Sequence, residues 1–358
     1  MTREPRAPGE KIRVVVADDS VVARDMLSQM LASDPDIEVV ATAVNGEEAV
    51  DAVERLHPDL VTMDIHMPRM DGLEATEQIM AYNPTPILVV SSSVYGAGMG
   101  RAFDALAVGA LEVIKKPELQ DWASLESIRR DVVGRVKMLA RVRVITHIRG
   151  KKLHPSRTPG PPLPESASYP SKIQIVAIGS STGGPSALLS VLARLPATFP
   201  VPLVIAQHIA DGFVPGLAQW LDAGSKIRVM PAADRGILMP GTAYLAATGC
   251  NMEIDGMLTR FVTPLSGQLY IPSADTLFDS VARLYGDRSL GVLLTGMGTD
   301  GAVGLKAMFD KGAPTICQDE ATSTVWGMPK AAIDIGATRT VLPVHQIADE
   351  IARIVRER

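Results

Sequence analysis

Residues 175–184 are IVAIGSSTGG, an apolar run that ends in hydroxyl side chains and two glycines. In the segment that follows, PSALLSVLARL, apolar residues recur with the period of a helix. We therefore predict a buried strand, a tight turn, and a helix whose first backbone N–H groups face that turn. A nucleotide phosphate and a nucleophilic serine both fit such a turn, so the choice between them depends on the rest of the chain.

Short apolar strands alternate with amphipathic helices on both sides of this segment. Five strand candidates lie between residues 12 and 145, and five more follow residue 172. This alternation indicates parallel sheets that are covered by helices on both faces. We expect an α/β fold with two doubly wound parallel-sheet domains, at residues 11–128 and 172–357, joined by a helix and a Pro/Ser-rich linker over residues 129–171.

The composition fits two domains and excludes several classes of function. The 358 residues carry a net charge of -5, which argues against a general affinity for nucleic acid, so we expect no nucleic-acid partner. The 2 cysteines are too few for a disulfide framework and favour a reducing compartment. The sequence has no signal peptide and no apolar run of about 18 residues, so we expect a cytoplasmic protein without membrane insertion.

Charged side chains follow three strands of the first half, at the point where each strand ends. Asp18 and Asp19 follow the first strand, Asp64 follows the third, and Lys116 follows the fifth. The carboxyl ends of parallel strands meet at one edge of the sheet, where carboxylates would repel one another unless a cation such as Mg²⁺ bound them. A single aspartate at a strand end usually caps the next helix, but capping does not explain this whole group with its lysine.

With these motifs, residues 12 to about 125 resemble the receiver domain of two-component response regulators. The resemblance implies a flavodoxin-like fold in which Asp64 accepts a phosphoryl group from a histidine kinase. It also implies that Mg²⁺ is held by Asp18, Asp19 and Asp64, and that Ser91 and Lys116 contact the phosphoryl oxygens.

The turn at residues 179–183 matches the nucleophile pattern G-x-S-x-G better than the dinucleotide pattern G-x-G-x-x-G. Ser181 stands where the dinucleotide pattern needs its second glycine. A serine needs a base and the base needs an orienting carboxylate, and His208 and Asp300 both follow buried strands of the second half. Taken singly, His208 is more simply explained as a hydrogen-bonded loop histidine than as a catalytic base. Asp300 taken singly is more simply explained as the N-cap of the next helix. Together with Ser181 they predict a catalytic triad.

Residues from about 172 to 355 are similar to the catalytic domain of the chemotaxis protein-glutamate methylesterases. The similarity rests on the motifs AIGSSTGGP, AQHIADGF, PSADTLFDSVA, LTGMGTDGA and VWGMPKAAI. It implies a Rossmann-like domain without a cofactor, in which Ser181 is the nucleophile, His208 the general base and acid, and Asp300 its orienting partner. Thr182 and Met297 would border the oxyanion site. Ile271 departs from the family, which frequently has an Arg there.

The two resemblances imply a phosphorylation-activated enzyme of chemotaxis adaptation. It would hydrolyse glutamate γ-methyl esters on methyl-accepting chemoreceptors, release methanol, and deamidate receptor glutamines. Two alternatives stay open: a non-enzymatic response regulator that only binds a receptor, and the same esterase in a chemosensory pathway that does not control motility. We expect a monomer.

Overall fold

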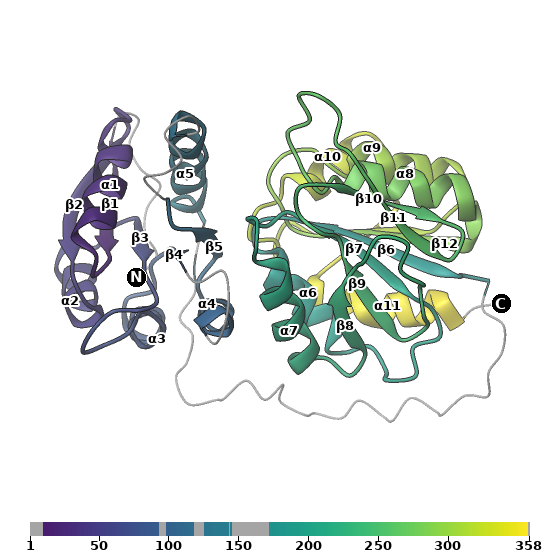
Figure 1. Ribbon diagram of the computed structural model, residues 1–358, viewed down its shortest axis with the longest axis horizontal. Coiled ribbons are helices and arrows are strands. Elements are labelled where there is room, and N and C mark those ends of the chain that lie inside the picture. Colours follow the sequence, from purple (N-terminus) through teal and green to yellow (C-terminus); the bar gives the residue numbers. More distant parts are fainter. Residues whose placement is uncertain (1–9, 93–97, 118–124, 143, 145–171, 357–358) are drawn as a thin grey trace. The chain divides into compact units, whose positions relative to one another are not determined.

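The computed structural model describes residues 10–92, 98–117, 125–142, 144 and 172–356 (Figure 1). The chain divides into two compact units, Met1–Arg157 and Thr158–Arg358. Each unit contains its own parallel sheet, and the predicted α/β fold with two doubly wound domains is confirmed. Residues 145–171, which make up most of the predicted linker, lie outside the described residues.

The first unit has a five-stranded sheet in the order β2-β1-β3-β4-β5, and every strand pair is parallel. Its strands are β1 (Ile12–Ala17), β2 (Ile37–Ala43), β3 (Leu60–Met63), β4 (Ile87–Ser91) and β5 (Glu112–Lys115). Its helices are α1 (Val21–Ala32), α2 (Gly46–Leu56), α3 (Gly72–Tyr82), α4 (Gly98–Ala107) and α5 (Leu125–Leu139). The strand order reverses between β1 and β3, so a crevice is expected beyond their carboxyl ends.

Helix α5 belongs to the hydrophobic core of this unit. Its buried residues Val132, Val133 and Val136 pack in one cluster with β1 and α1. Packing of the first unit therefore continues to Leu139, the last residue of α5.

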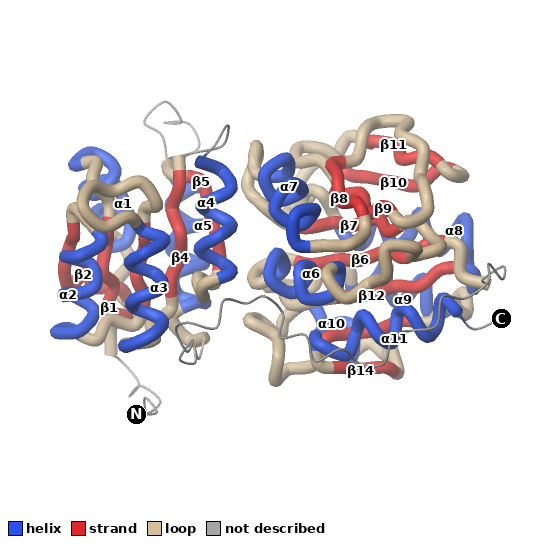
Figure 2. The backbone as a smooth tube through the Cα atoms, turned by 90° about the horizontal axis from the view of Figure 1, so that it is seen from below, coloured by secondary structure: helices blue, strands red, loops and turns tan. Residues whose placement is uncertain are grey.

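The second unit has a seven-stranded parallel sheet in the order β14-β13-β12-β6-β7-β9-β8, and a separate hairpin formed by β10 and β11 (Figure 2). Its strands are β6 (Ile175–Ser180), β7 (Leu203–Gln207), β8 (Arg228–Pro231), β9 (Thr242–Leu245), β10 (Asn251–Asp255), β11 (Leu258–Val262), β12 (Ser289–Leu293), β13 (Thr315–Gln318) and β14 (Thr340–Leu342). Its helices are α6 (Gly184–Leu192), α7 (Val214–Gly224), α8 (Ala274–Tyr285), η1 (Gly286–Arg288), α9 (Ala302–Asp310), α10 (Met328–Asp334) and α11 (Val344–Arg356).

The central strands β6, β7 and β12 are buried along their whole length, as expected for parallel strands covered on both faces. Their register brings the three carboxyl ends together, because Ser180 is paired with Gln207 and Gly179 with Leu293. The strand order also reverses around β6, where ligand sites of such sheets form.

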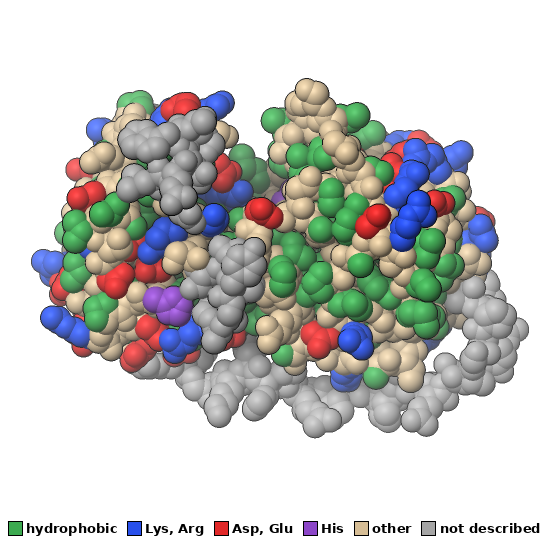
Figure 3. Space-filling view, viewed as in Figure 1, with side chains coloured by type: hydrophobic (Ala, Val, Ile, Leu, Met, Phe, Trp, Pro, Cys, Tyr) green, Lys and Arg blue, Asp and Glu red, His purple; other side chains and the backbone are tan. Residues whose placement is uncertain are grey.

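The surface of the second unit includes several large apolar side chains. Figure 3 shows broad apolar areas on its visible face, with few charges among them. Leu265 and Leu269, in the segment between β11 and α8, are 81% and 87% exposed.

Among the described residues, no helix combines the length and the apolar character needed to cross a bilayer.

Candidate functional site

Ser181 lies in the turn between β6 and α6. Its backbone N–H donates to Thr295 O at 3.0 Å, which fixes the turn against the chain that leaves β12. Gly183 has a φ of +75°, and a Cβ there would lie 2.3 Å from Thr324 Oγ1, so only glycine fits. The turn holds Ser181 at the N-terminal end of α6, where backbone N–H groups favour negative charge.

Gln207 holds the Ser181 and His208 segments side by side. Its Nε2 donates to Ser181 O at 2.9 Å and to His208 O at 2.8 Å, and its Oε1 accepts from Ser180 Oγ at 2.6 Å. His208 N also donates to Ser180 O at 2.9 Å. Gln207 was not among the predicted site residues, although an amide that ends the apolar run VPLVIAQ is a signal that it has buried partners.

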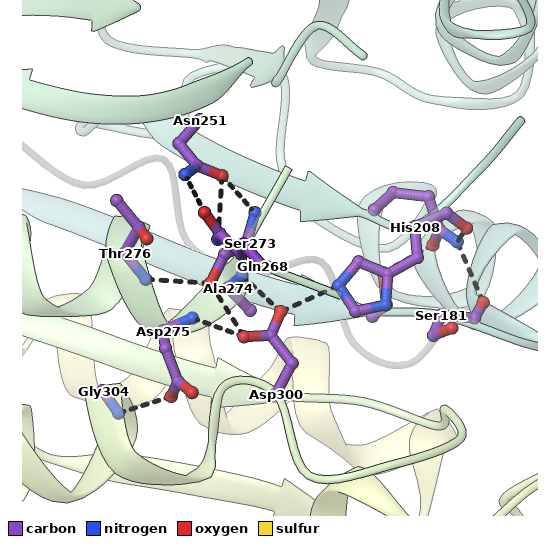
Figure 4. Close-up of polar contacts among 12 residues, drawn as sticks. Ser181, His208, Asn251, Gln268, Ser273, Ala274, Asp275, Thr276, Asp300 and Gly304 are labelled. Carbon is purple, nitrogen blue, oxygen red and sulfur yellow. Dashed lines mark hydrogen bonds and ion pairs between the residues drawn. The ribbon is translucent and has the colours of Figure 1, made fainter. Parts of the chain in front are cut away.

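The imidazole of His208 is bonded to the Asp300 carboxylate, with 2.8 Å between Nε2 and Oδ2 (Figure 4). Because a carboxylate oxygen accepts, Nε2 carries the ring proton and Nδ1 is left with a free electron pair. Nδ1 is buried and has no hydrogen-bond partner in the described part of the chain. In Figure 4 the ring lies between Asp300 and Ser181. Catalytic hydrogen bonds between a nucleophile and its base often form only with substrate, so the missing bond between Ser181 and Nδ1 does not speak against proton transfer.

Asp300 is surrounded by hydrogen-bond donors at the start of α8. Its carboxylate accepts from Ser273 Oγ at 2.8 Å and from Ala274 N at 2.6 Å, in addition to His208 (Figure 4). Burial alone would raise the pKa of Asp300, but the hydrogen bonds that it accepts from His208, Ala274 and Ser273 hold that pKa below its usual value. Asp300 therefore remains an anion at neutral pH, as an orienting carboxylate must.

A second carboxylate, Asp275, lies next to Asp300. Its backbone N–H donates to Asp300 Oδ1 at 3.2 Å, and its own Oδ1 accepts from Gly304 N at 2.6 Å. Burial and the nearby charge of Asp300 raise the pKa of Asp275 to about 6. No role was predicted for Ser273 or Asp275, although both stand in the motif PSADTLFDSVA.

The two residues expected to border the oxyanion site lie close to Ser181 in the structure. Thr182 is the next residue toward α6, and its carbonyl accepts from Thr295 Oγ1 at 3.0 Å. Met297 follows Gly296, where a Cβ would lie 2.7 Å from the Cβ of Ser181. The Met297 side chain is 46% exposed, so it lies at the open rim of the site.

The charged residues of the first unit gather at the carboxyl edge of its sheet. Lys116 Nζ lies 2.8 Å from Asp18 Oδ2 and 3.0 Å from Asp64 Oδ2. Burial raises the pKa of Asp64 although Lys116 opposes the shift. Burial disfavours the charged form of Lys116 too, but its bonds to Asp18 and Asp64 raise its pKa above the usual value, so it stays a cation. Ser91 is buried at the end of β4, and its carbonyl accepts from Lys116 N at 2.9 Å.

The same edge provides a set of oxygen donors that fits Mg²⁺. One carboxylate oxygen from each of Asp18, Asp19 and Asp64 lies within 4.8 Å of the others. Among the residues that the structure describes, Lys116 is the one cation that bridges two of them, so these three acids and Lys116 together keep an excess of negative charge. Converging carboxylates of this kind suit a small hard cation.

Comparisons with known proteins identify both units. A model of the CheB methylesterase family matches residues 176–351, and a model of the response regulator receiver domain matches residues 14–124. The chain is 43% identical over 346 residues to protein-glutamate methylesterase/protein-glutamine glutaminase 2 of Anaeromyxobacter dehalogenans (strain 2CP-C), covering 97% of this chain and 96% of the relative. It is 42% identical over 350 residues to protein-glutamate methylesterase/protein-glutamine glutaminase 1 of Syntrophus aciditrophicus (strain SB), covering 96% and 98%.

Solved structures resemble each unit separately. The CheB methylesterase catalytic domain of Thermotoga maritima is 35% identical, with a TM-score of 0.48, and the match covers 51% of this chain and 99% of that one. The response regulator domain of Thermotoga maritima CheB is also 35% identical, with a TM-score of 0.34, and the match covers 37% and 99%.

Proposed function

The chain belongs to the CheB methylesterase family, and we propose that Ser181, His208 and Asp300 carry out its hydrolysis of glutamate γ-methyl esters on chemoreceptors. The enzyme releases methanol and restores the glutamate, and it also deamidates receptor glutamines, which adapts the chemotaxis response. Its receiver domain makes the activity responsive to phosphorylation.

The first step forms an acyl-enzyme. The Ser181 Oγ attacks the ester carbonyl carbon while the free electron pair on His208 Nδ1 takes the hydroxyl proton. The Nε2–H of the resulting imidazolium remains bonded to Asp300, which stabilises the new positive charge. Backbone N–H groups at the start of α6, near Thr182, and in the chain around Met297 would stabilise the oxyanion. The His208 proton then leaves with the methoxide as methanol.

The second step returns the enzyme to its starting state. His208 removes a proton from water, the hydroxide attacks the acyl carbon, and the proton passes to Ser181 Oγ as the C–O bond to the enzyme breaks. The balance is one ester and one water converted into one carboxylic acid and one methanol. With a glutamine side chain the leaving group is ammonia, and Ser181, His208 and Asp300 keep the same roles. The hydrolysis requires no cofactor.

In the receiver domain, Asp64 is the phosphoryl acceptor and a histidine kinase is the donor. Mg²⁺ held by Asp18, Asp19 and Asp64 would neutralise charge on the phosphoryl group during transfer. Lys116, which already bonds Asp64, supplies a second positive charge to the same oxygens, and the Ser91 hydroxyl contributes a donor. A tenfold activation by phosphorylation needs only about 1.4 kcal/mol of differential stabilisation.

We assign the receiver domain to residues 11–128, the helix and linker to 129–171, and the methylesterase domain to 172–357. We further propose a cytoplasmic monomer. Cys250 and Cys317 are both free, which is in keeping with a reducing compartment.

The observation that carries the triad is the bond between His208 Nε2 and Asp300, together with the buried Nδ1, which has no hydrogen-bond partner among the described residues. The test uses chemoreceptor fragments with tritiated γ-methyl esters and measures volatile methanol. Ser181→Ala should lower release at least about 10³-fold. Ser190→Ala, the same change at an exposed position of α6, is the matched control and should keep full activity. If Ser181→Ala kept more than a few per cent of the activity, Ser181 would not be the nucleophile.

A further inference from the structure

One face of the His208 imidazole is covered by the phenol ring of Tyr270. The two ring centroids are 4.9 Å apart and the ring planes differ by 9°, so the rings are stacked. Tyr270 lies in the segment between β11 and α8 and is half-buried. It bonds to none of the three triad residues, yet it is in direct contact with the base.

The hydrogen bonds of His208 do not fix the plane of its ring. Nε2 is held by Asp300, whereas Nδ1 on the other side of the ring has no partner in the described residues. One hydrogen bond leaves the imidazole free to tilt about it, and a tilt would turn the Nδ1 electron pair away from Ser181. A flat ring stacked on one face opposes that tilt.

Tyr270 can serve as such a support because the hydroxyl end of its side chain lies against the backbone of Gly298. A Cβ at Gly298 would lie 2.2 Å from Tyr270 Oη, so the phenol rests directly against the Gly298 backbone. Gly298 has a φ of +87° and belongs to the loop that carries Asp300. Tyr270 therefore contacts both the base and the loop that orients the base.

Polar contacts hold the chain on both sides of Tyr270. Gln268 Oε1 accepts from Asn251 Nδ2 at 2.8 Å, and Asn251 Oδ1 accepts from Ser273 N at 2.9 Å (Figure 4). Asn251 is almost fully buried, so it anchors this segment from β10. The four residues between Gln268 and Ser273, which include Tyr270, are therefore held at both ends by these bonds.

We propose that Tyr270 is a positioning residue for the methylesterase reaction, which holds the imidazole plane so that Nδ1 faces Ser181. Its π face also lies against the ring that becomes a cation when His208 takes the serine proton, and aromatic faces attract cations. Tyr270 thus stabilises the transition state through His208 and does not itself touch the reacting atoms. This inference rests on the proposed role of His208 as the base.

The kinetic test compares two variants of the full chain. Tyr270→Leu removes the ring and should lower kcat about tenfold with KM changed less than about twofold, because the contact acts on the base and not on the substrate. Tyr270→Phe keeps the ring without the hydroxyl and should recover most of the lost kcat. Tyr82→Leu, at a tyrosine that is 68% exposed in the first unit, is the matched control.

A spectroscopic readout is independent of any receptor substrate. In the proton NMR spectrum, the ring current of Tyr270 should shift the Cε1–H signal of His208, identified by its loss in His208→Gln, to high field. The shift should persist in Tyr270→Phe and disappear in Tyr270→Leu. Loss of the shift in Tyr270→Leu with unchanged kcat would overturn the proposal, and so would an equal fall of kcat in Tyr270→Phe. Failure of the triad itself would show separately, as activity that survives in Ser181→Ala.

Discussion

Asp275 and Asp300 each bind the N-terminus of a helix with their carboxylate. Asp300 accepts from Ala274 N at 2.6 Å at the start of α8, while Asp275, within α8, accepts from Gly304 N at 2.6 Å in the first turn of α9. Helix N-termini favour such anions. These two contacts hold α8 and α9 together and fix the Asp300 carboxylate that orients His208. They also place the carboxylates of Asp275 and Asp300 side by side.

This crowding predicts a pH-dependent effect of Asp275→Asn on stability. The pKa of Asp275 is raised from 3.8 to about 6, so its contribution to stability is complete below 3.8 and is lost as the pH rises through about 6. Asparagine stays uncharged and can still accept from Gly304. After allowance for solvent screening, the variant should be more stable at pH 7.5 by about 1 kcal/mol, or about 2–4 °C in Tm.

At pH 4.5 the wild-type carboxyl of Asp275 is protonated, so the difference in Tm should shrink toward zero. Asp279→Asn, at a half-exposed position of the same helix, should show no such change between the two pH values. An equal difference in Tm between Asp275→Asn and the wild type at both pH values would mean that Asp275 does not titrate in this range.

Asp300→Asn should nearly abolish catalysis while the fold is kept. Asp300 Oδ2 accepts from both His208 Nε2 and Ala274 N, so an amide N–H₂ group in the place of Oδ2 faces two donors and can accept from neither. His208 would then lose the tautomer that leaves Nδ1 free. We expect kcat to fall about 10³–10⁴-fold in methanol release. Asp334→Asn, at an exposed ion pair of α10, is the control, and a fall in kcat below tenfold for Asp300→Asn would contradict this role.

Gln207→Leu should destabilise the methylesterase domain. Leucine has a similar volume but leaves the buried hydroxyl of Ser180 and the carbonyl of His208 without the hydrogen-bond partner that Gln207 provides. Each unsatisfied group costs about 1–3 kcal/mol, so Tm in a thermal melt should fall by about 5–15 °C. Gln346→Leu makes the same substitution at an exposed position and should change Tm by less than about 2 °C. Equal Tm values for the two variants would show that Gln207 does not brace the site.

Removal of Mg²⁺ should affect the two activities differently. A chelator should abolish phosphorylation of Asp64 by a small phosphodonor, because Asp18, Asp19 and Asp64 present oxygen ligands without enough positive charge of their own. Ester hydrolysis by the unphosphorylated chain should persist, since the triad needs no metal.

The matching variant is Asp64→Asn, in which the phosphodonor should no longer increase methanol release. Asp51→Asn, an exposed acid of α2, should respond as the wild type does. Stimulation of Asp64→Asn by the phosphodonor would place the phosphorylation elsewhere.

Much of this organisation follows from local patterns in the sequence. The alternation of apolar strands and amphipathic helices predicted the two parallel sheets, because backbone hydrogen bonding and burial impose their own period on each segment. Polar residues directly after buried strands, such as Ser181, His208 and Asp64, stood out for the same reason. Their meeting at one edge is a general property of parallel sheets.

The supporting residues could not be found in this way. Gln207, Tyr270 and Asp275 act on groups that are distant in sequence or belong to another helix, and their residue types occur at many positions without such roles. The strand order and register bring these residues to the triad. Both arise from packing of the whole domain, so no local pattern reveals them. The tertiary structure likewise decided which nitrogen of His208 faces the carboxylate, a choice made by the three-dimensional position of Asp300 and by no local pattern.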